Sequence, residues 1–259
     1  MIKHLLHSAL LCLTVSALAC GPTATEIETA PAVAAPTPPW DWTEEEVRAK
    51  VNAVRAGRDL TPESWPGGAR VAILLSFDVD NETVQGLRDG EASIGPLSQG
   101  EYGSRVALPR IVSLLDSEEV PATFFFPAWS LKLAPQQAGI IQATGRHEIA
   151  VHGWIHERNS VLDGDTERRL LEQAVDAIEE IAGTRPVGYR APSWNFSPNT
   201  LNIVRDLGFV YESSLMADDR PYELVADGEA TGIVELPVEW ILRPGAAIQP
   251  AGHSLQPAA

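Results

Sequence analysis

The stretch Val71-Ala-Ile-Leu-Leu-Ser-Phe-Asp-Val-Asp-Asn-Glu82 decides the fold, because an unbroken apolar run ends in closely spaced aspartates. The run predicts a buried strand over 71–77, and the Asp, Gly and Ser residues after it predict a loop over 81–103. Strand and helix patterns then alternate to about Val238. This βαβα order predicts an α/β fold with a parallel sheet or barrel, whose chemistry lies at the carboxyl ends of the strands.

Periodicity, capping residues and turn residues indicate the other elements. Thr43 and Glu46 have the spacing of a capping box, which begins a helix that reaches about Ala56. Further helices are expected at 104–117, 135–144, 166–182 and 198–208, and further strands at 122–126, 148–151, 187–190, 209–213 and 233–238.

The N-terminal region is expected to export and anchor the protein. Lys3 precedes an apolar run, so residues 1–19 have the pattern of a secretory signal peptide. The run ends in Ala17-Leu-Ala-Cys20, which resembles a lipoprotein box, and Cys20 would otherwise be a free thiol in the mature chain. We therefore expect secretion across the inner membrane and lipidation of Cys20 in the cell envelope, with plain secretion as the alternative.

Composition divides the rest of the chain into a tether, a helical lead-in, one catalytic domain and a tail. Residues 20–42 are rich in Ala, Pro, Thr and Glu and predict a flexible tether, and 43–66 predict a helical lead-in. Residues 67–242 suit one catalytic domain, and 243–259 form an irregular tail. The formal net charge of −16 disfavours nucleic acid and anionic membrane surfaces as partners, which leaves the lipid anchor as the membrane contact.

The chemistry-bearing residues fall in three segments at expected strand ends: Asp78 and Asp80, His152-Gly-Trp-Ile-His156, and Arg190. Each alone is weak evidence, since aspartates occur in solvated turns, histidine pairs on surfaces and arginines in structural ion pairs. Together they supply the parts of a mononuclear metal hydrolase site. One carboxylate and two imidazoles suit zinc, cobalt or a similar divalent ion and leave positions open for water and substrate.

Roles follow from this chemistry. Asp80, His152 and His156 are the expected metal ligands. Asp78 is the expected base that takes a proton from water, and Arg190 is expected to orient it through charge-assisted hydrogen bonds.

The same segments resemble the polysaccharide deacetylases of carbohydrate esterase family 4, and look most like the peptidoglycan-deacetylase-like subgroup. The segments that carry the resemblance are Trp65-Pro-Gly-Gly-Ala-Arg-Val71, Ser76–Glu82, His147-Glu148, His152–His156, Tyr189-Arg-Ala-Pro192, Ser213–Asp219 and Glu235-Leu-Pro-Val-Glu-Trp240. The resemblance implies a distorted (β/α) barrel of the polysaccharide deacetylase type over 67–242, hydrolysis of an N-acetyl amide, and the ligand, base and orienting roles given above. It also implies that Trp194 forms a wall of the substrate groove. His147 fits the pattern as well, with a structural role expected.

Two departures from the family pattern affect the interpretation. Val79 separates the two aspartates, a spacing typical of the subgroup that includes hydrolases of small cyclic amides and imides. The pattern also stops at about Leu242, where the last strands and a general-acid histidine are expected. A frameshift or truncated gene would explain this better than a natural terminus, and would leave an unpaired sheet edge near 234–238. His253 in the tail lacks a flanking strand and is not expected to be that acid.

The sequence thus predicts a metal-dependent amide hydrolase that removes N-acetyl groups from peptidoglycan or a chitin-like glycan. One alternative is a hydrolase of small cyclic amides or imides on the same fold. The other is a truncated, inactive domain that at most binds glycan. From the expected truncation we predict that this 259-residue chain, expressed without its signal, is aggregation-prone or partly unfolded and has negligible deacetylase activity.

Overall fold

The computed structural model describes residues 37–90 and 92–238. The expected signal peptide, Cys20, most of the tether, Trp240, the 243–259 tail and His253 lie outside these residues. The chain divides into two units, Met1–Trp42 and Thr43–Ala259. In the first, the described residues contain one 3-10 turn, Pro39–Asp41. The sheet and the α-helices described below belong to the second.

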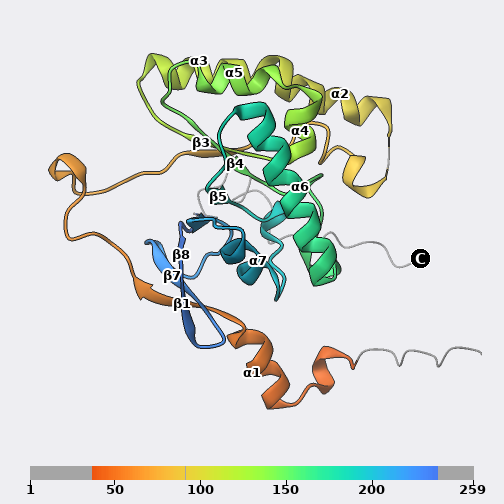
Figure 1. Cartoon of the computed structure of the whole chain (residues 1–259), viewed down its shortest axis with the longest axis vertical. Coiled ribbons are helices and arrows are strands. Elements are labelled where there is room, and N and C mark those ends of the chain that lie inside the picture. The colour runs from red at the N-terminus through yellow and green to blue at the C-terminus, as the bar shows by residue number, and fades with distance from the viewer. Residues whose placement is uncertain (1–36, 91, 239–259) are drawn as a thin grey trace, which may run out of the picture. The chain divides into compact units, whose positions relative to one another are not determined.

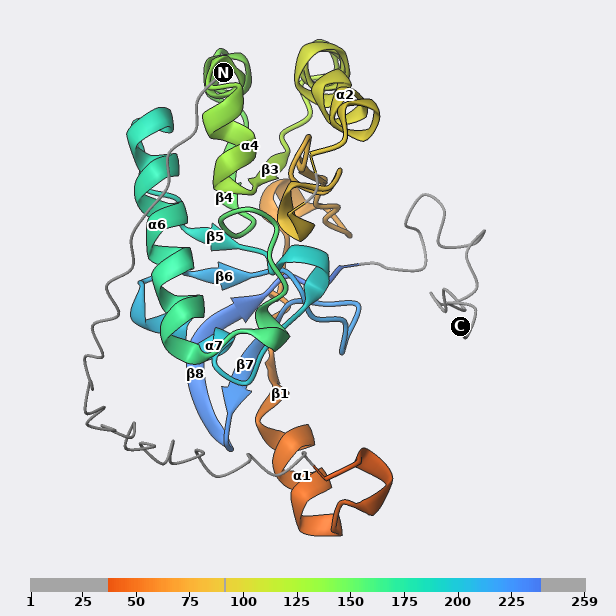
Figure 2. The ribbon, with the colours of Figure 1, turned by 90° about the vertical axis from the view of Figure 1, so that its right-hand side faces the viewer.

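The sheet has eight strands in the order β1-β7-β8-β6-β5-β4-β3-β2 (Figures 1 and 2). The strands are β1 (Val54–Asp59), β2 (Ser76–Asp78), β3 (Thr123–Phe126), β4 (Glu148–Val151), β5 (Gly188–Tyr189), β6 (Tyr211–Glu212), β7 (Tyr222–Ala226) and β8 (Glu229–Glu235). Pairing is parallel from β2 through β6 to β8, and antiparallel from β8 to β7 and β1. The predicted α/β fold with a parallel sheet is confirmed, and β1 and β2 are the ends of an incompletely closed barrel.

The structure describes seven α-helices, of which α1 precedes β1 and α2 to α7 fall between parallel strands, as the βαβα pattern predicts. They are α1 (Glu44–Asn52), α2 (Ile94–Tyr102), α3 (Leu108–Ser117), α4 (Ala128–Leu133), α5 (Gln136–Gln142), α6 (Gly164–Ala182) and α7 (Thr200–Asp206). A π-helical turn over Gly103–Ala107 joins α2 to α3. Helix α2 occupies a region where the sequence predicts a loop. In the part of the chain that is described, every helix is too short or too polar to cross a bilayer.

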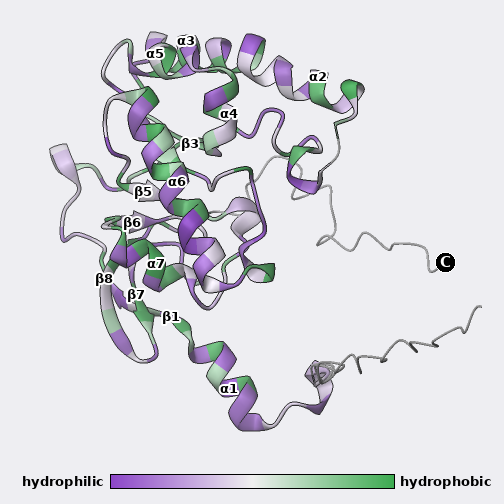
Figure 3. Cartoon of the chain, turned by 45° about the vertical axis from the view of Figure 1, so that its right-hand side comes forward, coloured by the Kyte–Doolittle hydropathy of each residue, from purple (hydrophilic) through white to green (hydrophobic). Residues whose placement is uncertain are grey.

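Local signals mark the starts of the helices better than their ends: the first helix ends at Asn52 instead of about Ala56, because Val54–Asp59 pairs with β7 as strand β1. The Thr43 hydroxyl accepts the Glu46 N–H at 3.2 Å while the Glu46 carboxylate accepts the Thr43 N–H at 2.7 Å, which confirms the capping box of α1. Helix α6 buries the apolar face that its periodicity predicts, and Figure 3 shows hydrophobic and hydrophilic colours alternating along it. The main core lies between these helices and the sheet, where Phe124 and Phe126 of β3 are buried, whereas Phe125 lies on the opposite face against the Arg190 guanidinium.

The first predicted strand is much shorter than its apolar run. Only Ser76–Asp78 forms strand β2, and Val71, Ile73 and Leu74 before it are 70%, 80% and 67% exposed. Strand β2 pairs with β3 and has no partner on its outer edge among the described residues. The prediction of a buried strand over 71–77 is therefore wrong in its first half, because no neighbouring element covers the run.

The expected unpaired edge near 234–238 is also wrong. Val234 of β8 faces Tyr211 of β6 on one side and Glu223 of β7 on the other. Strand β7, which the sequence analysis missed, supplies the second neighbour. It joins β8 through Asp227 and Gly228, whose φ angles are 48° and 86°, as a two-residue hairpin requires.

Candidate metal centre

The three chemistry-bearing segments converge at the carboxyl ends of parallel strands. Asp78 is the last residue of β2 and Asp80 lies just beyond it. His152 directly follows β4, and Arg190 directly follows β5. Because β2, β3, β4 and β5 are neighbours in the sheet, these side chains meet at one edge, as the sequence predicts.

Asp80, His152 and His156 form a group whose candidate ligand atoms all lie within 4.8 Å of one another. Nε2 of His152 is 3.7 Å from Oδ1 of Asp80, and Nε2 of His156 is 3.7 Å from Oδ2. Oδ1 of Asp80 is buried and has no hydrogen-bond partner among the described residues. A buried carboxylate oxygen without a donor, facing two imidazole nitrogens, fits a divalent metal ion, so these three residues can hold one.

Backbone contacts hold both imidazoles toward this point. Nδ1 of His152 lies 2.8 Å from the carbonyl oxygen of Arg190 and donates to it, which leaves Nε2 free as a ligand atom. His156 follows a tight turn and has a φ of 65°. The Glu157 carboxylate accepts the N–H groups of Trp154 at 2.9 Å and Ile155 at 2.8 Å, and so fixes that turn.

Asp78 is held by Arg190, as expected. Nη1 of Arg190 donates to Oδ1 of Asp78 at 2.6 Å, and Nη2 donates to Ser76 Oγ at 2.9 Å. The guanidinium also donates to Ser213, from Nε to the carbonyl oxygen and from Nη2 to the hydroxyl, both at 2.8 Å. Arg190 is therefore fixed on all sides, while Oδ2 of Asp78 lies 3.9 Å from Nε2 of His152. The Asp78 side chain remains 27% exposed and so can meet water.

The pKa shifts suit this division of roles. Burial raises the pKa of Asp78, but His152, Arg190 and the Arg190 hydrogen bond outweigh it, so the net pKa is lowered. Burial, opposed by His152 and assisted by Asp78, raises the pKa of Asp80. Burial first, then His152 and Arg88, lowers the pKa of His156 to about 3, which keeps this imidazole neutral as a metal ligand must be.

Several residues near the centre were not found from the sequence. Nη1 of Arg88 lies 3.0 Å from Nδ1 of His156, and Ser213 anchors Arg190. Glu157 directly follows the second histidine, and that adjacency was the available signal. Arg88 and Ser213 are distant in the sequence from His156 and Arg190, which they contact, and only the tertiary fold brings them together. Neither residue has a motif residue directly beside it that would have indicated this contact.

Two further predicted residues lie apart from the ligand set. His147 accepts the Ala122 N–H at 3.2 Å and lies 3.2 Å from Asp116, contacts that support the structural role expected for it. Trp194 is half-buried in the 3-10 turn that follows Arg190, with a φ of 54°. Its role as a groove wall stays a prediction.

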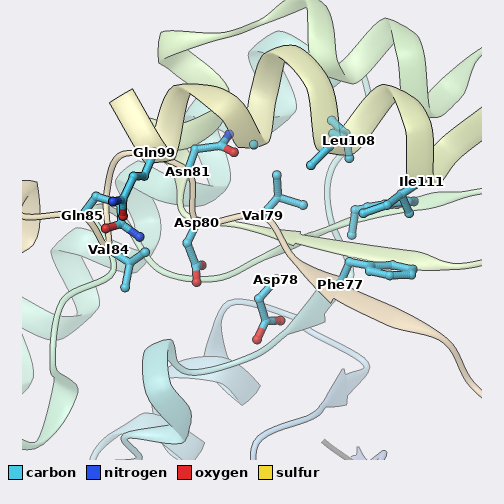
Figure 4. A pocket seen from close by; sticks show the side chains of 14 residues that line it. Phe77, Asp78, Val79, Asp80, Asn81, Val84, Gln85, Gln99, Leu108 and Ile111 are labelled. Atoms are coloured by element: carbon cyan, nitrogen blue, oxygen red, sulfur yellow. The ribbon is translucent and has the colours of Figure 1, made fainter. Parts of the chain in front are cut away.

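A cavity of about 230 Å³ lies beside the aspartate segment. Its apolar wall consists of Phe77, Val79, Leu108, Ile111 and Phe124. Figure 4 shows the carboxylates of Asp78 and Asp80 pointing to the opposite side of this segment from Val79. The apolar wall and the metal centre thus lie on opposite sides of the segment.

Residues 100–211 match the family model described as polysaccharide deacetylase. This chain belongs to the polysaccharide deacetylase family. A protein of Helicobacter pylori named peptidoglycan deacetylase is 32% identical over 195 residues, which cover 66% of this chain and 66% of that protein.

Two solved structures share the fold of this deacetylase family member. A structure described as a candidate polysaccharide deacetylase from Mycobacterium smegmatis is 40% identical with a TM-score of 0.62, over 71% of this chain and 64% of the other. Puue allantoinase is 27% identical with a TM-score of 0.59, over 69% and 65%. The chain thus spans a little under two thirds of these relatives' lengths.

Proposed function

We propose that this protein is a metal-dependent hydrolase that removes N-acetyl groups from a cell-wall glycan. The observation that carries the proposal is the arrangement of Asp80, His152 and His156 around one point, with a second carboxylate beside it that Arg190 holds in place. Family membership supports the same reaction class, hydrolysis of a carbon–nitrogen bond other than a peptide bond.

Each residue of the site has a distinct role in the proposed reaction. Asp80, His152 and His156 would hold a divalent ion, which would supply Lewis-acid activation of water and of the substrate carbonyl. Asp78 accepts a proton from the attacking water at Oδ2, because Oδ1 is occupied by Arg190. Two imidazoles and one carboxylate favour zinc, with cobalt as an alternative. Arg190 keeps Asp78 ionised and fixed in orientation.

Peptidoglycan is the substrate that we propose first. The Helicobacter pylori relative is named for that substrate, and expected secretion would bring the enzyme to the cell wall. Trp194 is proposed to pack against a sugar ring.

A cyclic amide or imide is the second candidate substrate. The Asp-Val-Asp spacing and the 27% identity to an allantoinase favour it. Both reactions use the same metal centre, so geometry at Asp78 and Asp80 does not separate them.

Product analysis separates the candidates. The purified protein, loaded with zinc, is incubated with N-acetylglucosamine oligomers, with peptidoglycan fragments and with a cyclic imide, and acetate release and ring opening are measured. The proposal expects acetate release that Asp80→Ala abolishes. Ring opening alone would favour the second candidate, and a filled metal site without any turnover would favour an inactive glycan-binding domain.

The cellular location is a proposal of its own. We propose that the protein is secreted and anchored by a lipid on Cys20. Metabolic labelling with a radioactive fatty acid should mark the wild-type protein and not Cys20→Ala. Equal labelling of both, or of neither, would refute the anchor.

A further inference from the structure

Two glutamates are buried side by side in the sheet, on the neighbouring strands β6 and β8. Glu212 of β6 and Glu235 of β8 are register partners in a parallel pair, so their side chains extend to the same face. Both residues are 0% exposed. Paired strands lie about 4.8 Å apart, so the two carboxyl groups are close together, and each affects the pKa of the other. Two carboxylates in such contact cannot both be ionised at low cost, so the pair must hold a proton.

The neighbouring donors indicate which glutamate carries the proton. The Glu212 carboxylate accepts the Ser214 N–H at 2.8 Å and the Ser214 hydroxyl, so both of its oxygens accept as an ionised group does. Oε1 of Glu235 accepts the Leu215 N–H at 3.0 Å, whereas Oε2 meets no donor among the described residues. A proton on Oε2 of Glu235, donated to Glu212, would satisfy both groups.

This pair fixes the segment that holds Arg190. Glu212 and Glu235 bind Ser214 and Leu215, and the adjacent Ser213 accepts two hydrogen bonds from the Arg190 guanidinium. The Ser214 hydroxyl also accepts the N–H of Ala191, directly after Arg190, at 2.8 Å. The Ser213–Leu215 segment therefore connects the two glutamates to Arg190 by hydrogen bonds.

We propose that Glu212 and Glu235 share one proton, carried by Glu235, and that this neutral-plus-ionised pair positions Arg190 and through it Asp78. Both are positioning residues, because their contacts are with the Ser213–Leu215 segment. The proposal rests on the orienting role of Arg190 given above.

The surroundings favour one negative charge on the pair. Arg190, directly after β5, interacts favourably with Glu235, and two described tyrosines face the pair as register partners, Tyr189 of β5 beside Glu212 and Tyr222 of β7 beside Glu235. Burial raises the pKa of both tyrosines, so they remain neutral. Burial raises the pKa of both glutamates, and Glu212 raises that of Glu235 further, in agreement with one proton held by the pair.

Two variants of Glu235 test whether the hydrogen-bond donor that it presents to Glu212 is what matters. Glu235→Gln keeps the shape and supplies an N–H donor to Glu212, whereas Glu235→Ala leaves Glu212 buried without that donor. We expect kcat of Glu235→Gln to stay within about twofold of the parent, and that of Glu235→Ala to fall about tenfold to a hundredfold with KM and metal content unchanged.

Two readouts do not depend on turnover. The Arg190 Nε–H NMR signal should be protected from solvent exchange in the parent and in Glu235→Gln, and should exchange rapidly in Glu235→Ala. A protonated-carboxyl band in the infrared spectrum of the parent should be absent from Glu235→Gln. These readouts test the pair even if the parent shows no deacetylase activity, so the two proposals can fail separately.

Glu167→Ala is the matched control. Glu167 is 4% exposed and accepts hydrogen bonds from the hydroxyls of Ser197 and Thr200, a buried network whose described contacts do not include Arg190. Its loss should lower stability and leave the Arg190 Nε–H signal protected. The proposal is overturned if Glu235→Ala also leaves that signal protected, if Glu235→Gln exposes it, or if the parent lacks the infrared band.

Discussion

Replacing Arg190 with Met should destabilise the fold strongly. Methionine keeps the apolar stem and removes the guanidinium, whose carbon lies 4.1 Å from the ring centre of Phe125. The change removes four hydrogen bonds, two of which end on Ser213, a residue that is 4% exposed. Each buried group left without a partner costs about 1–3 kcal/mol, whereas water can solvate part of Asp78. We therefore expect the free energy of unfolding to fall by about 3 kcal/mol.

Urea denaturation of the purified protein measures this loss. Arg168→Met is the matched control, because Arg168 forms an equally short ion pair with Asp206, at 2.6 Å, but the two side chains are 37% and 44% exposed. An exposed pair contributes less than about 1 kcal/mol. Equal small losses in both variants would refute the structural importance assigned to Arg190.

Three further predictions concern the aspartates and the exposed apolar run. Asp78→Asn should retain bound metal, measured by atomic emission, yet lose most acetate release because an amide cannot accept the proton of water; retained activity would refute the base assignment. Because the pKa of Asp78 is lowered in the folded state, its contribution to stability should be complete above about pH 4 and be lost as the pH falls through the lowered value. Acid titration of the unfolding free energy should therefore show a shallower fall in Asp78→Asn, and identical curves would contradict this. Ile73, 80% exposed before β2, should be replaceable by Lys with less aggregation and an unchanged melting temperature; a lower melting temperature would show that Ile73 is buried in solution.

The ligand set and its strand ends could be predicted because their signals are local. His152 directly follows the alternating pattern of β4, and Arg190 directly follows β5, so each chemical group is placed by the strand that precedes it. Parallel pairing then brings the strand ends together without any knowledge of the loops.

The missed features depend on long-range partners. The apolar run before Ser76 has the pattern of a buried strand, but burial needs a neighbour that the pattern cannot reveal. Strand β1, Val54-Arg-Ala-Gly-Arg-Asp59, has the composition of a charged loop and becomes a strand only by pairing with β7. For β7 and β8, the Asp227-Gly228 turn was an available hairpin signal. Arg88 contacts His156, and Glu212 lies beside Glu235. These partners are distant in the sequence, so no local pattern indicates the contacts.

The central claim is that Asp80, His152 and His156 hold one metal ion. Isothermal titration of the metal-free protein with zinc tests it most directly, in parallel with His152→Ala and with His147→Ala, a buried histidine outside the ligand set. We expect about one tight site per chain in the parent and in His147→Ala, and loss of that site in His152→Ala. Unchanged zinc binding in His152→Ala would contradict it.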